Sequence, residues 1–375
     1  MSSRHGKRML GSVLFVCAVA NALQAEDKVT LVRNNEVLMG RVKKEDAEQI
    51  EMEVREKTGQ TGVRKLSPSD ITDIEWDIND AEWREGYRHF KRGSYGKAAQ
   101  SFNSIIGDKE SLDKIRPEAK PYLFFMYAES LYRSGNAKEA VPAFEKCINE
   151  FTSSFYSSYA VGSLVDAAIQ NNDFTKVPPL LSKLRALSGE PKAMADYYEG
   201  KMWKAQKKSK DARNKFLAAE RGSSVPATKG MALMGQASCA LEEGNLVEAR
   251  DLAQKALASG NIPSVAGAAH LIIGNAMVAE ADSAKLMGEA LEFKLLDALL
   301  EFMRVHMQYA GDRNTEPEAM LRAGDCLQRL AKAFPKTRGA DRHRAIAMYS
   351  RLKEDPRYRG TSWSEAAGEA MKNFR

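Results

Sequence analysis

The histidines are the side chains of this chain best suited to chemistry near neutral pH, because imidazole serves both as a general base and as a metal ligand. They stand at His5, His89, His270, His306 and His343. None belongs to a His-Glu-x-x-His pattern, and none is paired with Cys or His at the spacing of zinc ligands. His306 lies between Val305 and Met307 in a helical pattern, so we expect it to pack or to face solvent. The histidines predict no metal site.

Other patterns that carry chemistry are missing from the sequence as well. There is no Gly-x-Ser-x-Gly segment that would mark a serine nucleophile. The segment Gly93–Ala98 contains a Gly-Lys pair, but it lacks the upstream Gly and the following Ser or Thr of a phosphate-binding loop. Neighbouring carboxylates such as Glu242 and Glu243 are typical of solvated helix faces. We therefore predict that the chain is not an enzyme and holds neither a metal nor another cofactor.

A short pattern that returns along the chain indicates which elements position its side chains. A small residue recurs at Ala98, Ala140, Val177, Ala212 and Ala249, at intervals of 42, 37, 35 and 37 residues. Four residues after each stands Phe102, Phe144, Leu181, Phe216 or Ala253. The small residue allows two helices to approach closely, and the residue four later fills the gap on the same face. The pattern predicts an array of helical hairpins from residue 78 to residue 375.

The residues between the two helices of each hairpin predict the turns. Gly93, Gly135 and Gly244 favour the left-handed backbone that commonly ends a helix. Asn172 and Lys207 stand at the same place in the two other repeats and adopt that conformation less readily. We expect a sixth hairpin after residue 268, with an insertion between Ala281 and Leu291.

The segment from Tyr127 to Phe151, YAESLYRSGNAKEAVPAFEKCINEF, resembles a tetratricopeptide repeat, whose period is about 34 residues. The resemblance implies a mainly α fold, with six or seven hairpins in a right-handed superhelix and a C-terminal capping helix. It also implies a concave groove lined by the first helix of each repeat. The residues at the matching positions are Trp83, Tyr87, Phe90, Tyr122, Phe125, Glu129, Tyr132, Arg133, Tyr159, Tyr197, Lys201 and Lys204. Each aromatic ring among them could instead pack against a neighbouring helix or the preceding domain.

The first 25 residues have the form of a secretory signal peptide. Arg4, Lys7 and Arg8 precede an apolar run that is shorter than the roughly 20 residues of a membrane span. Small residues follow, so we expect cleavage after Ala22 or Ala25 and a periplasmic or secreted chain. Removal of the three basic residues lowers the formal net charge from +6 to +3, which excludes the concentrated basic field of a nucleic-acid-binding protein.

Residues 26–77 have apolar residues that alternate with polar ones, which predicts strands. The alternating residues are Val29, Leu31, Val37, Met39, Val42, Ile50, Met52, Val54, Val63, Leu66, Ile71 and Ile74. Four or five strands of this length must curl around one core, as a small barrel or an open sheet. The run TLVRNNEVLMGRVK and the later KLSPSDITDIEW resemble the small Sm-like or SH3-like barrels of some bacterial envelope proteins. The resemblance implies a small β-barrel-like domain with a structural or docking role.

Three cysteines remain after the predicted cleavage, at Cys147, Cys239 and Cys326, and we expect them to be buried thiols in helix packing. Together these features favour an exported, non-enzymatic scaffold that binds a protein or peptide partner through its concave face. One alternative is a self-assembling structural component of the envelope, for cell-division coordination or outer-membrane assembly. The other is an enzyme with an unrecognised site, either between Ala281 and Leu291 or between the barrel and the repeats. We expect no nucleic-acid partner and no transmembrane segment in the mature chain.

Overall fold

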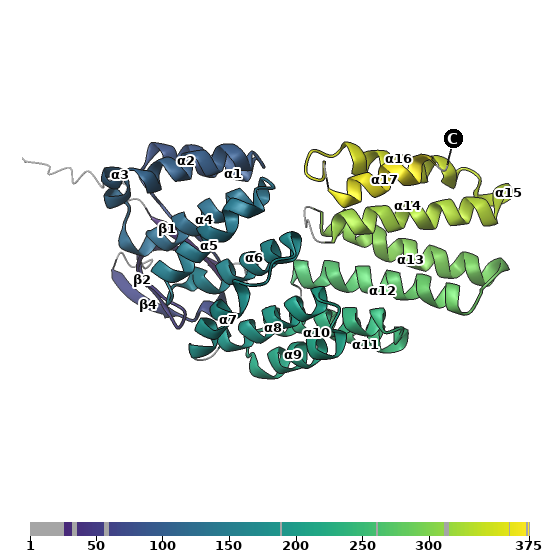
Figure 1. The fold of residues 1–375 in the computed structure, drawn as a ribbon, viewed down its shortest axis with the longest axis horizontal. Coiled ribbons are helices and arrows are strands. Elements are labelled where there is room, and N and C mark those ends of the chain that lie inside the picture. The colour runs from purple at the N-terminus through teal and green to yellow at the C-terminus, as the bar shows by residue number, and fades with distance from the viewer. Residues whose placement is uncertain are drawn as a thin grey trace, which may run out of the picture.

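A computed structural model describes residues 26–31, 36–55, 60–187, 190–259, 262–310, 315–359, 361–372 and 374. Within them a small β-sheet precedes a chain of helical hairpins (Figure 1). The sheet and the first hairpins lie at one end of the molecule, the last hairpins at the other, and α8–α11 connect the two. The expected signal peptide lies outside the described residues. No helix among those described has the length and apolar composition needed to cross a membrane.

The sheet has five antiparallel strands in the order β4-β3-β2-β1-β5. Its strands are β1 (Asp27–Leu31), β2 (Val37–Glu45), β3 (Ile50–Arg55), β4 (Thr61–Leu66) and β5 (Ile71–Glu75). Strands β4 and β5 form the two edges and do not pair with each other in the described residues. The β-barrel-like domain that the sequence predicts is therefore an open sheet and not a closed barrel.

The inward face of β2 differs from the sequence prediction. Val29 of β1 pairs with Leu38, so Leu38 and Val42 point into the core, whereas Val37 and Met39 are exposed on the other face. Three consecutive apolar residues, at 37–39, fit both faces of a strand equally well. The register with β1 decides between them.

The helices pair into seven antiparallel hairpins among the described residues. They are α1 (Ala81–Lys91) with α2 (Tyr95–Gly107), α4 (Lys120–Arg133) with α5 (Ala137–Glu150), α6 (Phe155–Asn171) with α7 (Val177–Ala186), α8 (Glu190–Ala205) with α9 (Ser209–Gly222), α10 (Pro226–Glu242) with α11 (Leu246–Ala258), α12 (Pro263–Ser283) with α13 (Gly288–Gln308), and α14 (Glu316–Ala333) with α16 (Asp341–Glu354). The short helix α3 (Lys109–Lys114) lies between the first and second hairpins, and α15 (Pro335–Arg338) lies between the two helices of the seventh. At the end of the array α17 (Ser362–Lys372) packs on α16.

The repeating small and bulky residues occupy the interior, as the pattern predicts. Ala98, Phe102, Ala140 and Phe144 are fully buried, and the corresponding pairs of the next three hairpins are buried too. The facing helix is kept close by a small residue of its own: a Cβ on Gly86 of α1 would lie only 2.7 Å from the Phe102 ring. The phase of the repeat is thus confirmed over the first five hairpins.

The turn positions are confirmed as well. The backbone is left-handed at Gly93, Gly135 and Gly244, with φ of 76°, 87° and 81°. It is also left-handed at Asn172 and Lys207, with φ of 52° and 62°, where the side chain makes this conformation costly. The turn geometry is therefore imposed by hairpin packing even where the residue is unfavourable.

The sixth hairpin differs from the prediction. Helices α12 and α13 each have 21 residues and are joined by a short turn at Lys285, whose φ is 48°. The stretch predicted as an insertion is the end of α12, this turn and the first residues of α13. The longer interval comes from longer helices, and the pair Ala298 and Phe302 continues the buried pattern there.

The sheet and the first hairpins share one hydrophobic core. Val29, Ile50 and Ile74 of the strands belong to the same cluster of buried side chains as Phe102 and Tyr122 of the helices. The indole Nε1 of Trp76, just after β5, donates a hydrogen bond of 2.7 Å to the hydroxyl of Tyr156 in α6. The cysteines at 147, 239 and 326 are buried among the helices, as expected.

Two carboxylates fasten the sheet to the helices. Asp27, which is 1% exposed, accepts hydrogen bonds from the backbone of Val42 and Asp77 and from the Arg116 guanidinium at 2.5 Å. Glu45, at the end of β2, accepts from the backbone N–H of Phe155 at 2.8 Å and from the hydroxyl of Ser154. Glu45 therefore lies at the positive end of the α6 dipole.

Candidate functional site

A hollow of about 1330 Å³ lies between the first and the last hairpins. Figure 1 shows the connection between α16 and α17 facing the ends of the first two hairpins. One wall is formed by residues 93–97, 129, 132–135, 163 and 166, and the other by residues 317, 356–359 and 361–363. The hollow therefore has walls that are far apart in the sequence.

The wall from the first hairpins is held by Arg133, at the end of α4. Its Nε donates to Glu129 at 2.6 Å, and its guanidinium lies over the rings of Phe90 and Tyr95. The other oxygen of Glu129 accepts from the Ser163 hydroxyl at 2.8 Å, which connects α4 to α6. These contacts fix a carboxylate, a cation and two rings on three neighbouring hairpins.

Tyr132 adds a hydrogen-bond donor to this wall. Burial raises the pKa of Tyr132 to about 12, so its hydroxyl stays protonated at neutral pH. One helix further, Lys201 of α8 forms an ion pair with Asp166 of α6. Burial acts against the charge of Lys201, but the Asp166 carboxylate outweighs it and holds the lysine pKa above its usual value. Lys204 continues the row towards Glu242 of α10, at 3.3 Å.

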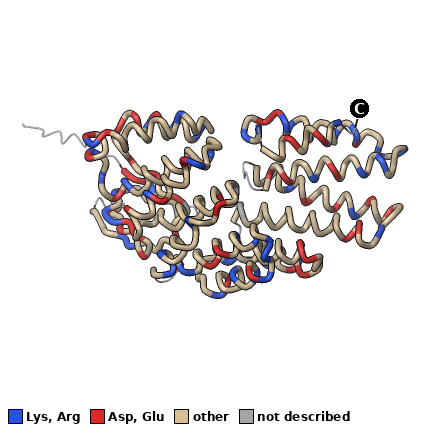
Figure 2. The backbone as a smooth tube through the Cα atoms, in the orientation of Figure 1, with Lys and Arg blue, Asp and Glu red and all other residues tan. Residues whose placement is uncertain are grey.

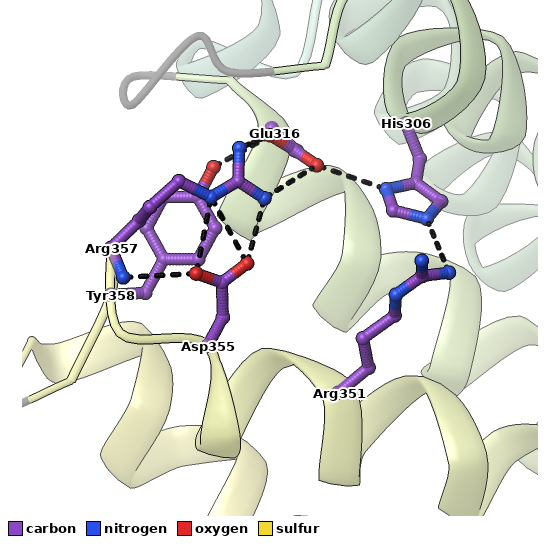
Figure 3. Close-up of polar contacts among 6 residues, drawn as sticks. All are labelled: His306, Glu316, Arg351, Asp355, Arg357 and Tyr358. Atoms are coloured by element: carbon purple, nitrogen blue, oxygen red, sulfur yellow. Dashed lines mark hydrogen bonds and ion pairs between the residues drawn. The ribbon is translucent and has the colours of Figure 1, made fainter. Parts of the chain in front are cut away.

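The opposite wall depends on a buried carboxylate, Glu316, at the first position of α14 (Figure 3). It accepts from the Tyr358 hydroxyl at 2.6 Å, lies 3.1 Å from Arg357 Nη1, and lies 3.1 Å from His306 Nδ1. Arg357 also binds Asp355 at 2.7 Å, and this hydrogen bond holds the pKa of Asp355 below its usual value. The network fastens residues 355–358, which border the hollow, to α13 and α14.

The net charge of the hollow comes from charged residues that take no part in these ion-pair networks. Lys97 and Arg359 line it from opposite walls, both are exposed, and neither has an ion-pair partner in the part of the chain that the structure describes. The half-buried rings of Tyr95, Tyr132 and Trp363 lie on the same walls. Over the rest of the molecule, acidic and basic residues are interspersed along most elements (Figure 2). The hollow combines uncompensated positive charge with aromatic surface.

The structure brings only part of the predicted groove together. Glu129, Tyr132 and Arg133 line the hollow, and Lys201 contacts its wall through Asp166. Trp83 and Tyr122 are 4% and 7% exposed. These two rings lie within the core that the sheet shares with the helices.

The other predicted residues lie elsewhere. Trp83 and Tyr87 border a second, smaller hollow of about 400 Å³ where the sheet meets α1. Phe125 packs against Tyr156, and Tyr197 against Phe216. Phe90 lies under the Arg133 guanidinium, Lys204 pairs with Glu242, and Tyr159 is exposed beside Phe155.

Sequence reasoning did not single out Lys97, Arg357, Arg359 and Trp363. The last three belong to the run DPRYRGTSW, which is rich in basic and aromatic residues and joins two helical segments. That composition is a signal of a binding loop. Nothing in the sequence, however, indicates that it faces the turn at Gly93, more than 250 residues away.

The comparisons with known proteins agree with this architecture over a limited segment. Residues 122–154 match the family model of the tetratricopeptide repeat. No curated protein matches the chain. Among solved structures, the chain is similar to pilF of Pseudomonas aeruginosa (17% identity, covering 69% of this chain and 100% of that chain, TM-score 0.41). It is also similar to a tetratricopeptide repeat protein from Parabacteroides merdae (12% identity, covering 77% of this chain and 97% of that chain, TM-score 0.47). A third similar structure is human IFIT1 (14% identity, covering 78% of this chain and 72% of that chain, TM-score 0.38).

The matched segment comprises α4, α5 and the residues that lead into α6. This is the hairpin that supplies Glu129, Tyr132 and Arg133 to the hollow. Repeats of this kind are typically non-enzymatic scaffolds that mediate contacts between proteins. The chain is accordingly a mainly α array of tetratricopeptide-like helical hairpins, preceded by a five-stranded antiparallel sheet.

Proposed function

We propose that this chain is an exported scaffold that binds an acidic segment of a protein partner in the hollow between its first and last hairpins. The observation that carries the proposal is the pair Lys97 and Arg359, which face the hollow from opposite walls without a partner in the described residues. An acidic segment between them would meet both charges at once.

The size and the stiffness of the hollow support a peptide as the ligand. At about 1330 Å³ it exceeds the roughly 300 to 1,000 Å³ of typical small-molecule pockets. The rings of Tyr132 and Trp363 offer contact area at little cost in side-chain entropy. The ion pairs around Glu129 and Glu316 hold both walls in place before binding, which lowers the ordering cost of the complex.

The proposed location of the chain is outside the cytoplasm, in the periplasm or the medium. It is supported by Arg4, Lys7 and Arg8, followed by an apolar run and small residues. Amino-terminal sequencing of the chain recovered from an expressing bacterium tests it. We expect the mature chain to begin at Leu23 or Glu26, in the periplasm or the medium, and an intact cytoplasmic chain would contradict export.

Binding is tested with short synthetic peptides rich in Asp and Glu that carry one aromatic residue, titrated against the mature chain. We expect binding that weakens as salt is added, and a loss of at least about fivefold in affinity for Lys97→Glu combined with Arg359→Glu. Lys255→Glu is the matched control and should bind like the wild type, because Lys255 is exposed on α11 and does not line the hollow. Equal affinity of the double variant and the control would overturn the proposal, as would a preference for Lys-rich peptides.

A further inference from the structure

Helix α13 exposes an apolar stripe that the fold does not cover. Phe293 is 65% exposed, Leu300 58% and Met307 74%, and they follow one another at intervals of seven residues. Seven residues are close to two helical turns, so the three side chains lie in one line along the helix. At about 1.5 Å per residue the line is roughly 21 Å long.

The opposite face of the same helix explains why the stripe is not a packing error. Leu295, Ala298, Phe302 and Val305 are completely buried against the neighbouring helices. The helix is thus held firmly in one rotation about its axis. Single exposed apolar residues are common, but three in register on an anchored helix mark a contact surface.

The stripe has an apolar flank on one side and a charged flank on the other. On one side Leu296 and Met303 are partly buried and extend the apolar surface towards the core. On the other side stand Asp297 and Arg304, both exposed. Within the described residues Asp297 has no ion-pair partner. Arg304 pairs there only with Glu301 of its own helix, at 2.5 Å.

The stripe is complementary to itself when it is reversed. Phe293 and Met307 each lie seven residues from Leu300, and Asp297 and Arg304 lie three before it and four after it. A two-fold axis at Leu300 would place each Asp297 beside Arg304 of the other copy, within one residue of register. A parallel pair would instead place Asp297 and Arg304 against the apolar flank of the other copy, at Leu296 and Met303, where neither charge finds a partner.

We propose that two copies of this chain associate through α13, packed antiparallel about a two-fold axis at Leu300. Such an interface is isologous: the same surface serves both partners and closes the assembly at two copies. A lipid surface is a poorer occupant, because basic residues normally border a membrane-binding stripe, whereas here one acid alternates with one base. The proposal rests on α13 and not on the hollow, so it is independent of the proposed function.

The direction of packing is tested with single cysteines and a short bis-maleimide crosslinker. Cys147, Cys239 and Cys326, the native cysteines among the described residues, are buried, so in a chain expressed without residues 1–25 the introduced thiol is the accessible one. We expect Leu300→Cys to crosslink to itself, Phe293→Cys and Met307→Cys to crosslink poorly alone, and a mixture of these two to crosslink efficiently. Efficient self-crosslinking of Phe293→Cys would show a parallel pair and overturn the proposal.

The charges are tested by sedimentation over a range of protein concentrations. We expect a concentration-dependent dimer, which Leu300→Glu abolishes and Asp297→Arg weakens by about tenfold. Adding Arg304→Asp to Asp297→Arg should restore the dimer, because the swapped charges face each other again. Val247→Glu and Asp251→Arg, at two exposed positions of α11, are the matched controls and should leave the dimer unchanged.

A wild-type chain that stays monomeric at every concentration, with no Leu300→Cys crosslink, would overturn the proposal and leave the stripe to another partner. Circular dichroism shows whether each variant keeps its helices, so a misfolded variant is recognised as such. Peptide binding by Leu300→Glu separates the two proposals, since the hollow does not include α13 residues around position 300. Lost dimerisation with retained peptide binding is the expected combination.

Discussion

The first hairpins and the sixth hairpin share one pattern of packing but differ in what covers their apolar residues. In the first, Trp83 lies with its ring centre 5.2 Å from Phe102 and 5.5 Å from Tyr122, beneath the sheet. In the sixth, Ala298 and Phe302 fill the interior while Leu300 and its neighbours in the stripe face outwards. A helical repeat fixes how two helices pack together. The apolar surface that remains outside this contact becomes core where another part of the chain packs on it, and it stays exposed where none does.

The largest expected difference in stability is between a variant of a buried side chain and a variant of an exposed one. Phe102→Ala should lower the free energy of unfolding by about 3 to 5 kcal/mol, because it removes a fully buried ring and leaves a cavity. Leu300→Ala should change it by less than about 0.5 kcal/mol in a dilute, monomeric sample. Urea unfolding followed by circular dichroism measures both. Equal losses would mean that the stripe is part of the core.

The next test concerns the link between the sheet and the helices. Arg116→Ala should cost about 3 kcal/mol, because it leaves the buried Asp27 carboxylate without its cation. Lys114→Ala, which breaks an exposed pair with Glu110, should leave the stability close to that of the wild type. The comparison is made by urea unfolding at neutral pH. If the two variants lose the same stability, the sheet is not held by this contact.

The pH dependence of stability should come partly from Glu45. Burial raises its pKa to about 7, from the usual 4.5, so the folded state holds a proton that the unfolded state has already released. The contribution is therefore full below about pH 4.5 and is lost as the pH rises through 7, by roughly 3 kcal/mol. Glu45→Gln should flatten the stability curve between about pH 5 and 8, because the amide binds no proton in either the folded or the unfolded state. An unchanged slope for Glu45→Gln would contradict the assignment.

The smallest expected effects lie in the turns. Lys207→Gly should stabilise the chain by about 1 kcal/mol, because glycine adopts the left-handed backbone without the clash of a Cβ. Gly244→Ala should destabilise it by about the same amount for the same reason. Thermal unfolding of the two variants beside the wild type measures the difference. Changes of the same sign would show that turn strain is not what distinguishes the two hairpins.

The sequence predicted the hairpins well because their pattern is local. The spacing of Ala98 and Phe102, and of their equivalents, depends only on the contact between a helix and its immediate neighbour. The turn at Lys207 could be located in the same way, even without glycine. The open sheet was predicted as strands, but the closed or open state depends on pairing between its edges, which no single strand encodes.

The candidate site was predicted less completely, because its parts come together over long distances in the chain. Tyr132 and Arg133 followed from their place in the repeat, whereas Arg359 and Trp363 reach the same hollow only after seven hairpins have stacked. Trp83 and Tyr122 occupy groove positions by count, yet the sheet covers them. Repeat geometry gives the position of a side chain, and only the finished packing gives its exposure.

The way in which the sheet is fastened also has a consequence for the order of events during synthesis. Trp76 contacts Tyr156, Asp27 contacts Arg116, and Glu45 contacts Phe155, across separations of 80, 89 and 110 residues. At roughly 5 to 20 residues per second, the ribosome needs about 4 to 20 s to supply these partners after the strands have emerged. Until α4 and α6 emerge, the apolar face of the sheet has only α1 and α2 of the helices in its core to bury against, and a chaperone that meets the nascent chain would find the rest of that face exposed.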